Sequence, residues 1–123
     1  MPGVKAIAGT FATASGPNCF GAVMAAAGVT GAETEWMQLE PFEKWLAAQC
    51  RPIRGSRSKP GTVLVWRDPE RVAQHAAICV DEDFALEKPS QGWMTPRWVR
   101  PLAEIIQTNR AKWQRLERHQ LER

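Results

Sequence analysis

The hydrophobic pattern of the first half of the chain predicts two helices. Residues 19–27 are mostly strong helix formers, with Asn18 suited to cap the start and Gly28 suited to end the helix. A second helix is expected over residues 40–50, where apolar positions recur at helical spacing. The apolar face of this second helix comprises Phe42, Trp45 and Leu46.

The middle of the chain changes to a strand pattern. Residues 51–61 are rich in Pro, Gly, Ser and Arg and are predicted to form a loop. The nearly continuous apolar and β-branched run over residues 62–68 suits a strand that is buried on both faces. A second strand is expected over residues 75–80. An acidic turn, residues 81–84, then leads into a third, antiparallel strand over residues 85–89 that ends at a proline.

The last third is predicted to begin with an irregular segment or edge strand over residues 90–99, followed by an amphipathic helix over residues 101–120. The apolar residues of this helix are Leu102, Ile105, Ile106, Trp113 and Leu116. The order of elements predicts one α+β domain over residues 1–123. Its core is expected to span about residues 11–106, and residues 107–123 to form a charged C-terminal helix.

Composition supports a folded protein and argues against several function classes. The chain has 123 residues, 44% of them hydrophobic, with six tryptophans. The net charge of +3 is concentrated in the last fifteen residues, so nucleic-acid binding is not expected. The three cysteines cannot all pair and contain no CxxC spacing, which predicts neither a disulfide framework nor a zinc site. No apolar run reaches the length of a membrane span.

Cys19 is the first candidate for chemistry. A cysteine at a helix N-terminus lies at the positive end of the helix dipole, which stabilises the thiolate. The free backbone N–H groups at that end can also stabilise an oxyanion. By position alone, Cys19 is equally explained as a buried packing residue, which is the role expected for Cys50 and Cys79. Trp66 is likewise expected in the core.

Two further polar residues complete a candidate triad. His75 begins an apolar strand, where a hydrophobic residue would be the ordinary choice, and it could take the proton of Cys19. A hairpin around residues 81–84 would bring Glu87 beside His75, where a carboxylate could orient the imidazole. His119 lies among Arg and Glu in the predicted tail helix and is expected on the surface.

In this order, the motifs "NCFGAV", "KPGTVLVW", "HAAICVDED" and "ALEKPSQG" resemble the papain-like cell-wall cysteine peptidases, namely the NlpC-type peptidases and their CHAP relatives. The resemblance spans about residues 17–92. It implies a papain-like fold, with a nucleophile at a helix N-terminus packed on a small antiparallel sheet. It also implies Cys19 as nucleophile, His75 as base and Glu87 as the orienting residue.

The chain departs from that family at Asn18, where an aspartate is usual, and at Phe20, where a small residue is usual. It also has no tyrosine, which many NlpC-type enzymes place near the oxyanion. Asn18 and Phe20 are therefore candidates for contacts with the substrate or the oxyanion. Trp93 and Trp98, in the irregular segment, are further candidates for lining a substrate groove.

The resemblance implies a cysteine peptidase or amidase that cleaves an amide bond in bacterial peptidoglycan and needs no metal or organic cofactor. A related deamidase or acyltransferase acting on protein or lipid, and a non-enzymatic binding module, stay open as alternatives. An inhibitor or immunity protein stays open as a partner. An enzyme acting on the wall has to leave the cytoplasm, but residues 1–14 form only a weak apolar patch with one lysine, so the localisation and the export route stay open.

Overall fold

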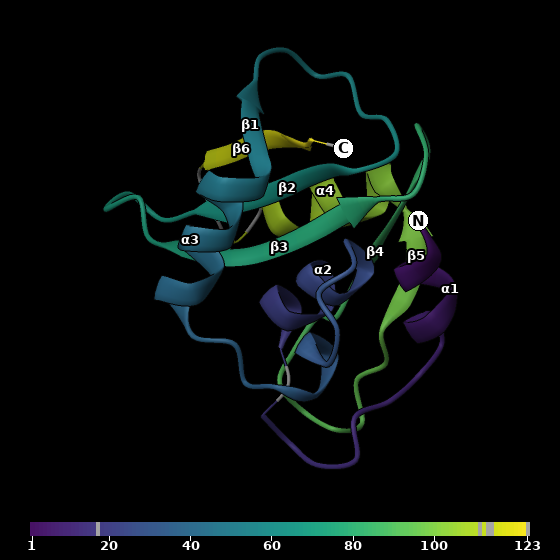
Figure 1. The fold of residues 1–123 in the computed structure, drawn as a ribbon. Helices are drawn as coiled ribbons and strands as arrows, with labels where there is room; N and C mark the ends of the chain where they lie inside the picture. Colours follow the sequence, from purple (N-terminus) through teal and green to yellow (C-terminus); the bar gives the residue numbers. More distant parts are fainter. Residues whose placement is uncertain (17, 111, 113–114, 123) are drawn as a thin grey trace.

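An antiparallel sheet of six strands forms the centre of the structure, a computed structural model that describes residues 1–16, 18–110, 112 and 115–122. The strand order is β1-β6-β2-β3-β4-β5, and every pair of neighbours is antiparallel (Figure 1). The elements are α1 (Pro2–Ile7), α2 (Cys19–Ala26), the 3₁₀ turn η1 (Ala32–Thr34), α3 (Leu39–Gln49), β1 (Cys50–Ile53), β2 (Thr62–Arg67), β3 (Ala73–Cys79), β4 (Phe84–Glu87), β5 (Trp98–Pro101), α4 (Leu102–Arg110) and β6 (Arg115–Leu121). The predicted α+β class is confirmed.

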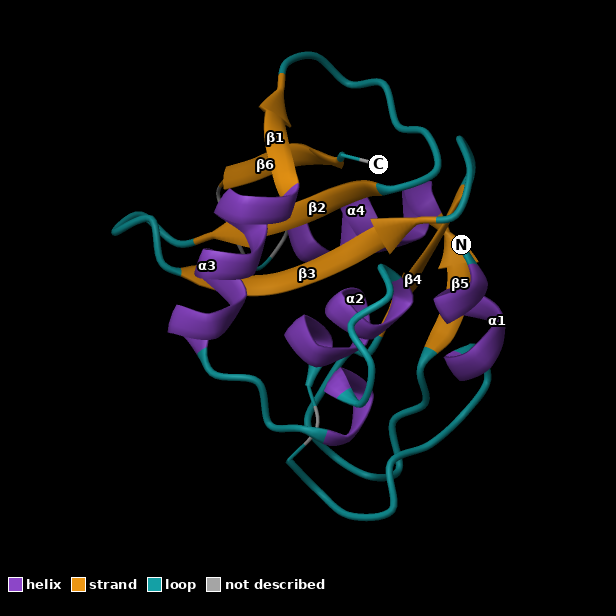
Figure 2. Ribbon diagram, in the orientation of Figure 1, coloured by secondary structure: helices purple, strands orange, loops and turns teal. Residues whose placement is uncertain are grey.

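Helices cover both faces of the sheet (Figure 2). α1, α2 and α3 pack on one face and α4 packs on the other. Each face of the sheet has its own hydrophobic core, and the side chains of β2 point alternately into the two cores. Val63 and Val65 face α2, whereas Leu64 and Trp66 face α4. All six residues of β2 are buried, as the continuous apolar run predicts. Trp66 is only 1% exposed, which confirms its predicted place in the core.

The predicted C-terminal helix is wrong beyond Arg110. α4 ends there, and residues 115–121 form β6, which pairs with both β1 and β2. Leu102, Ile105 and Ile106 pack on the sheet from α4, whereas Leu116 does so from β6. Trp113, predicted on the same helix, lies outside the described residues. The core is correspondingly larger than residues 11–106, because β6 lies inside the sheet and Ile7 is also buried.

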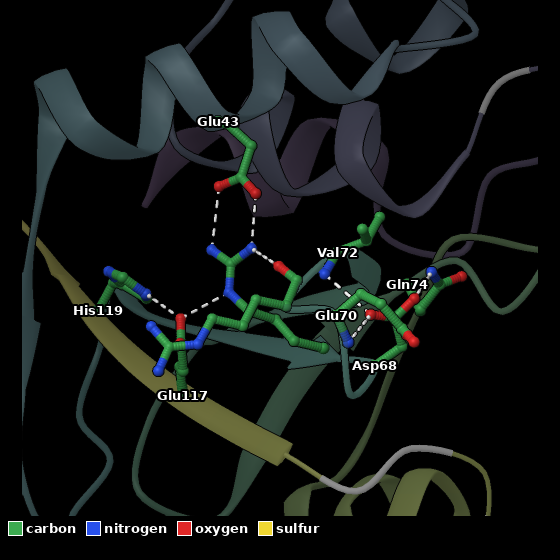
Figure 3. Close-up of polar contacts among 9 residues, drawn as sticks. Glu43, Asp68, Glu70, Val72, Gln74, Glu117 and His119 are labelled. Carbon is green, nitrogen blue, oxygen red and sulfur yellow. Dashed lines mark hydrogen bonds and ion pairs between the residues drawn. The ribbon is translucent and has the colours of Figure 1, made fainter.

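Polar pairing explains why a charged segment can occupy an inner strand position. Arg67 of β2 is a buried cation held between the carboxylates of Glu43 and Glu117, both of which are labelled in Figure 3. Its Nε donates to Glu117 of β6 at 2.8 Å, and its Nη2 donates to Glu43 of α3 at 3.0 Å. Thr62 donates to Gln120 at 2.8 Å at the other end of the strand pair. These tertiary contacts override the helical preference of the isolated segment.

Two smaller predictions are wrong because residues 115–121 form a strand and not a helix. Residues 50–53, expected to end a helix and begin a loop, form the edge strand β1 because β6 supplies its partner. Pro52 is tolerated because an edge strand leaves one side without ladder bonds. His119 is not a surface residue of a helix. Its side chain is 12% exposed in β6, with Nε2 3.1 Å from Oε1 of Glu117.

Among the described residues, the longest helix is α3, with 11 residues, and none of the helices is both long and apolar enough to cross a bilayer.

Candidate functional site

Cys19 is the first residue of α2, and the local sequence fixes it there. Asn18 caps the helix, because its Oδ1 accepts the backbone N–H of Gly21 at 3.1 Å. The Nδ2 of Asn18 donates to the carbonyl of Met37 at 2.8 Å. The predicted cap is confirmed. The Asn18 side chain therefore serves the fold, although the residue also borders the cavity described below.

The first turn of α2 is packed tightly against its neighbours. A Cβ atom at Gly21 would lie 2.4 Å from the carbonyl oxygen of Ala32, so only glycine permits this approach of α2 to η1. Phe20 stacks on Phe42 of α3, with ring centroids 4.4 Å apart. Its ring is thus an anchor of the helix in the core. These contacts leave Cys19 at 8% exposure, at the boundary between core and cavity.

The backbone at the start of α2 offers two donors. Among the described residues, the N–H groups of Cys19 and Phe20 have no hydrogen-bond acceptor. Such groups are the ordinary oxyanion donors of a nucleophile at a helix start.

His75 and Glu87 form a buried pair, and His75 lines a cavity together with Cys19 at the start of α2. His75 Nε2 lies 2.7 Å from Glu87 Oε1, and the two side chains are 8% and 3% exposed. Continuing the β3–β4 register from Ile78 opposite Leu86 places Glu87 opposite Ala77, two residues from His75 along β3. The hairpin argument from the sequence therefore predicted a pair of residues that the structure does bring together. Trp66 closes one side of the pair, with its ring 5.5 Å from that of His75.

Arg100 of β5 supports the carboxylate from the other side, with Nη1 donating to Glu87 Oε2 at 2.8 Å. Burial disfavours the charged form of Glu87, but His75 and Arg100 outweigh it and hold the pKa of Glu87 below its usual value. Glu87 is thus an ionised acceptor fixed between two donors. The sequence analysis missed Arg100, for which alternation with Trp98 along a strand would have been the only signal.

Cys19 and His75 line the same cavity, and Cys19 affects the titration of His75. Burial lowers the pKa of His75, but the hydrogen bonds with Cys19 and Glu87 and their negative charges raise it to about 9. Because Nε2 of the ring is engaged by Glu87, Nδ1 is the nitrogen that remains for Cys19. The order of groups is therefore sulfur, imidazole, carboxylate, as in a nucleophile with a base and an orienting acid.

The other two cysteines differ from Cys19 in their surroundings. Burial and, second, the charge of Glu122 raise the pKa of Cys50 to about 11. Burial raises the pKa of Cys79 to about 11 despite a hydrogen bond with Ser58. Both thiols therefore stay protonated at neutral pH and pack in the interior, which is the role that the sequence predicts for them.

A cavity of about 220 Å³ opens over Cys19 and His75. It is lined by Asn18, Cys19, Phe20, Gln74, His75, Lys88, Pro89, Ser90 and Gln91. A cavity of about 760 Å³ lies where α1, β1 and β6 meet, but its lining includes none of the triad residues. We therefore take the smaller cavity as the candidate active site, because it is the one that contains reactive groups.

Two predicted site residues lie elsewhere. Trp93 and Trp98 are 54% and 41% exposed and are not among the described residues that line the cavity. Trp98 instead stacks under the guanidinium of Arg100, 5.3 Å from the ring centroid. Trp98 lies directly opposite Glu87 in the β4–β5 register, on the same face of the sheet. The cavity is lined instead by residues 88–91, which follow β4.

The cavity also contains two amides that the sequence analysis did not single out. Gln74 is positioned by the β2–β3 turn, since its Nε2 donates to Asp68 at 3.0 Å (Figure 3). The same aspartate accepts the backbone N–H groups of Glu70 and Val72 and so fixes the turn. Gln91 also lines the cavity and is exposed. Both are donors that a peptide substrate could meet.

Among the described residues, no cluster of three or more His, Cys, Asp or Glu side chains could hold a metal ion. Comparison of the chain with protein families, curated proteins and solved structures finds no match.

Proposed function

We propose that the protein is a thiol hydrolase of the papain-like class that cleaves an amide bond. The observation that carries this proposal is the buried His75–Glu87 pair, 2.7 Å apart, whose histidine lines the same cavity as a cysteine at a helix N-terminus. The sequence resemblance assigns these three residues to nucleophile, base and orienting acid, and their contacts agree with those roles.

In the proposed reaction, His75 takes the proton of the Cys19 thiol and the sulfur attacks the amide carbonyl carbon. The tetrahedral oxyanion accepts hydrogen bonds from the free N–H groups at the start of α2. The C–N bond then breaks, and the imidazolium of His75 gives its proton to the leaving amine. Water, deprotonated by His75, hydrolyses the thioester. The products are a carboxylic acid and an amine, and the thiol is restored.

Peptidoglycan is the substrate that the resemblance favours. The matching segments contain all three triad residues, which supports a cell-wall peptide over an unrelated amide. The departures from the family pattern have structural roles here: Asn18 caps α2 and Phe20 anchors it on α3. Neither departure removes a group that the proposed chemistry needs, because the oxyanion donors are backbone N–H groups.

The decisive experiment is digestion of purified peptidoglycan, followed by separation of released muropeptides and labelling of new amino groups. Release of fragments with one new amine per cleaved bond supports the proposal. Absence of fragments together with covalent labelling of Cys19 by an acyl probe would point instead to a deamidase or acyltransferase. Absence of fragments and of any enhanced Cys19 reactivity would point to a binding module.

A Glu87→Gln variant is expected to keep its fold and lose activity by about a hundredfold, mainly in kcat. The amide can still accept a hydrogen bond from His75, but it no longer stabilises the imidazolium by charge. Steady-state kinetics on the cleaved substrate measure the loss.

The matched control is Glu104→Gln. Glu104 is the other carboxylate near Arg100, at 3.6 Å, and its side chain is 60% exposed. This variant should retain wild-type kinetics. Equal losses of kcat in Glu87→Gln and Glu104→Gln would contradict the proposed role of Glu87. They would show that activity depends on the carboxylates through Arg100 and not through the imidazole of His75.

A further inference from the structure

Lys88 is a buried ammonium beside the triad. It follows β4 directly, and its side chain has no exposed surface. The Nζ donates to the carbonyl oxygens of Ser90 at 2.6 Å and of Gly92 at 2.8 Å. Within the described part of the chain, no carboxylate forms an ion pair with Lys88. A buried cation without an acidic partner is costly and calls for a specific role.

Among the described residues that line the cavity with Lys88, only Cys19 can carry a negative charge. Burial and, second, the charge of Arg97 lower the pKa of Lys88, whereas the charge of Cys19 raises it. Both Lys88 and Cys19 line the same cavity. Cys19 attracts an ammonium when it is a thiolate and not when it is a neutral thiol. The attraction therefore acts in the form of Cys19 that reacts.

The two carbonyls held by Lys88 belong to the cavity wall. Ser90 Oγ lies 2.6 Å from Thr95 Oγ1, and the Gly92 N–H donates to Ser90 Oγ at 3.2 Å. The Gly16 N–H donates to the carbonyl of Gln91 at 3.0 Å, which connects this wall to the segment just before Cys19. The ammonium therefore holds the backbone of residues 90 and 92, in a wall that borders the same cavity as the nucleophile.

We propose that Lys88 is a second cation of the active site, which stabilises the Cys19 thiolate together with His75 and holds the wall over residues 89–92 beside it. The inference rests on the proposed function in one respect, namely that Cys19 reacts as a thiolate. A methionine could fill the same elongated space without a charge. The lysine thus contributes a positive charge to the site in addition to filling the space.

The experiment compares the wild-type chain with Lys88→Met and Lys88→Arg. The rate of Cys19 alkylation by iodoacetamide is measured by mass spectrometry from pH 4 to pH 10. Lys88→Met should alkylate about tenfold more slowly than the wild type at neutral pH. Lys88→Arg keeps the charge and should lie between the two. Lys44→Met is the matched control, because Lys44 is 76% exposed on α3, and it should follow the wild type.

A folded Lys88→Met with the wild-type alkylation profile would overturn the proposal. Should this variant not fold, His75→Gln provides the second measurement, because Lys88 is then the remaining cation at the sulfur. The ratio of the rate with anionic iodoacetate to the rate with neutral iodoacetamide should be several-fold higher for His75→Gln than for N-acetylcysteine. An equal ratio for both thiols would also overturn the proposal.

Neither readout needs a substrate, so the two proposals can fail separately. A chain that cleaves no amide but alkylates more slowly as Lys88→Met supports the role of Lys88 and rejects the hydrolase. A chain that cleaves peptidoglycan but alkylates at the same rate as Lys88→Met rejects the role of Lys88 alone.

Discussion

A Cys19→Ala variant should release no detectable fragment from the substrate that the wild type cleaves, a loss of at least about 10⁴-fold in kcat. The methyl group cannot form the thioester, and no other thiol of the described residues borders the cavity. The loss of one sulfur atom at the core boundary should cost little stability, since Cys19 retains 8% exposure. Fragment release and thermal unfolding are measured on the same preparation.

Cys79→Ala is the control for the general effect of removing a buried thiol. Cys79 is fully buried in β3, on the face that packs against α4, so its replacement should affect stability more than activity. Activity that persists in Cys19→Ala and disappears in Cys79→Ala would refute the assigned nucleophile.

A His75→Ala variant should lose about 10³-fold or more in kcat/KM, since the site then lacks both the base for the thiol and the acid for the leaving amine. The alkylation rate of Cys19 at neutral pH should fall in parallel. His119→Ala is the matched control, because it removes the chain's other histidine from β6, where the ring contacts Glu117 and does not line the cavity over Cys19. Comparable losses in both variants would contradict a specific role for His75.

The wild type should also show the titration of His75 on the alkaline side. Because Cys19 and Glu87 raise the pKa of His75 to about 9, the imidazolium persists through neutral pH, and kcat/KM should decline as the pH rises through about 9. The contribution of His75 to the stability of the fold changes with pH in the same direction as kcat/KM. The raised pKa favours the folded state below about pH 6.5, the ordinary value, and this contribution disappears as the pH passes about 9.

The sequence was sufficient for the parts of the fold whose pattern is local. The alanine-rich helix after Asn18 and the buried run of β2 were predicted because their own residues determine helix or double-sided burial. The pairing of His75 with Glu87 followed from a short hairpin, for which sequence separation limits the alternatives.

The parts that failed depend on distant partners. Residues 115–121 contain two leucines among charged residues, and they form a strand through pairing with β1 and β2, supported by the ion pair of Glu117 with Arg67. Lys88 gave no signal of burial, because a lysine after a strand is ordinarily exposed and its acceptors are backbone carbonyls. Long-range pairing and side-chain bonds to the main chain leave little trace in local composition.

The position of β6 has a consequence for how the protein is made. This strand follows all the others in the sequence, yet it inserts between β1 and β2, joining Thr62 to Gln120 across 58 residues. Contacts between such distant residues form slowly, and until they form both β1 and β2 keep an unpaired edge. During synthesis on a ribosome, Cys19, His75 and Glu87 emerge well before β6 does. The six-stranded sheet on which His75 and Glu87 lie is therefore completed only as β6 docks.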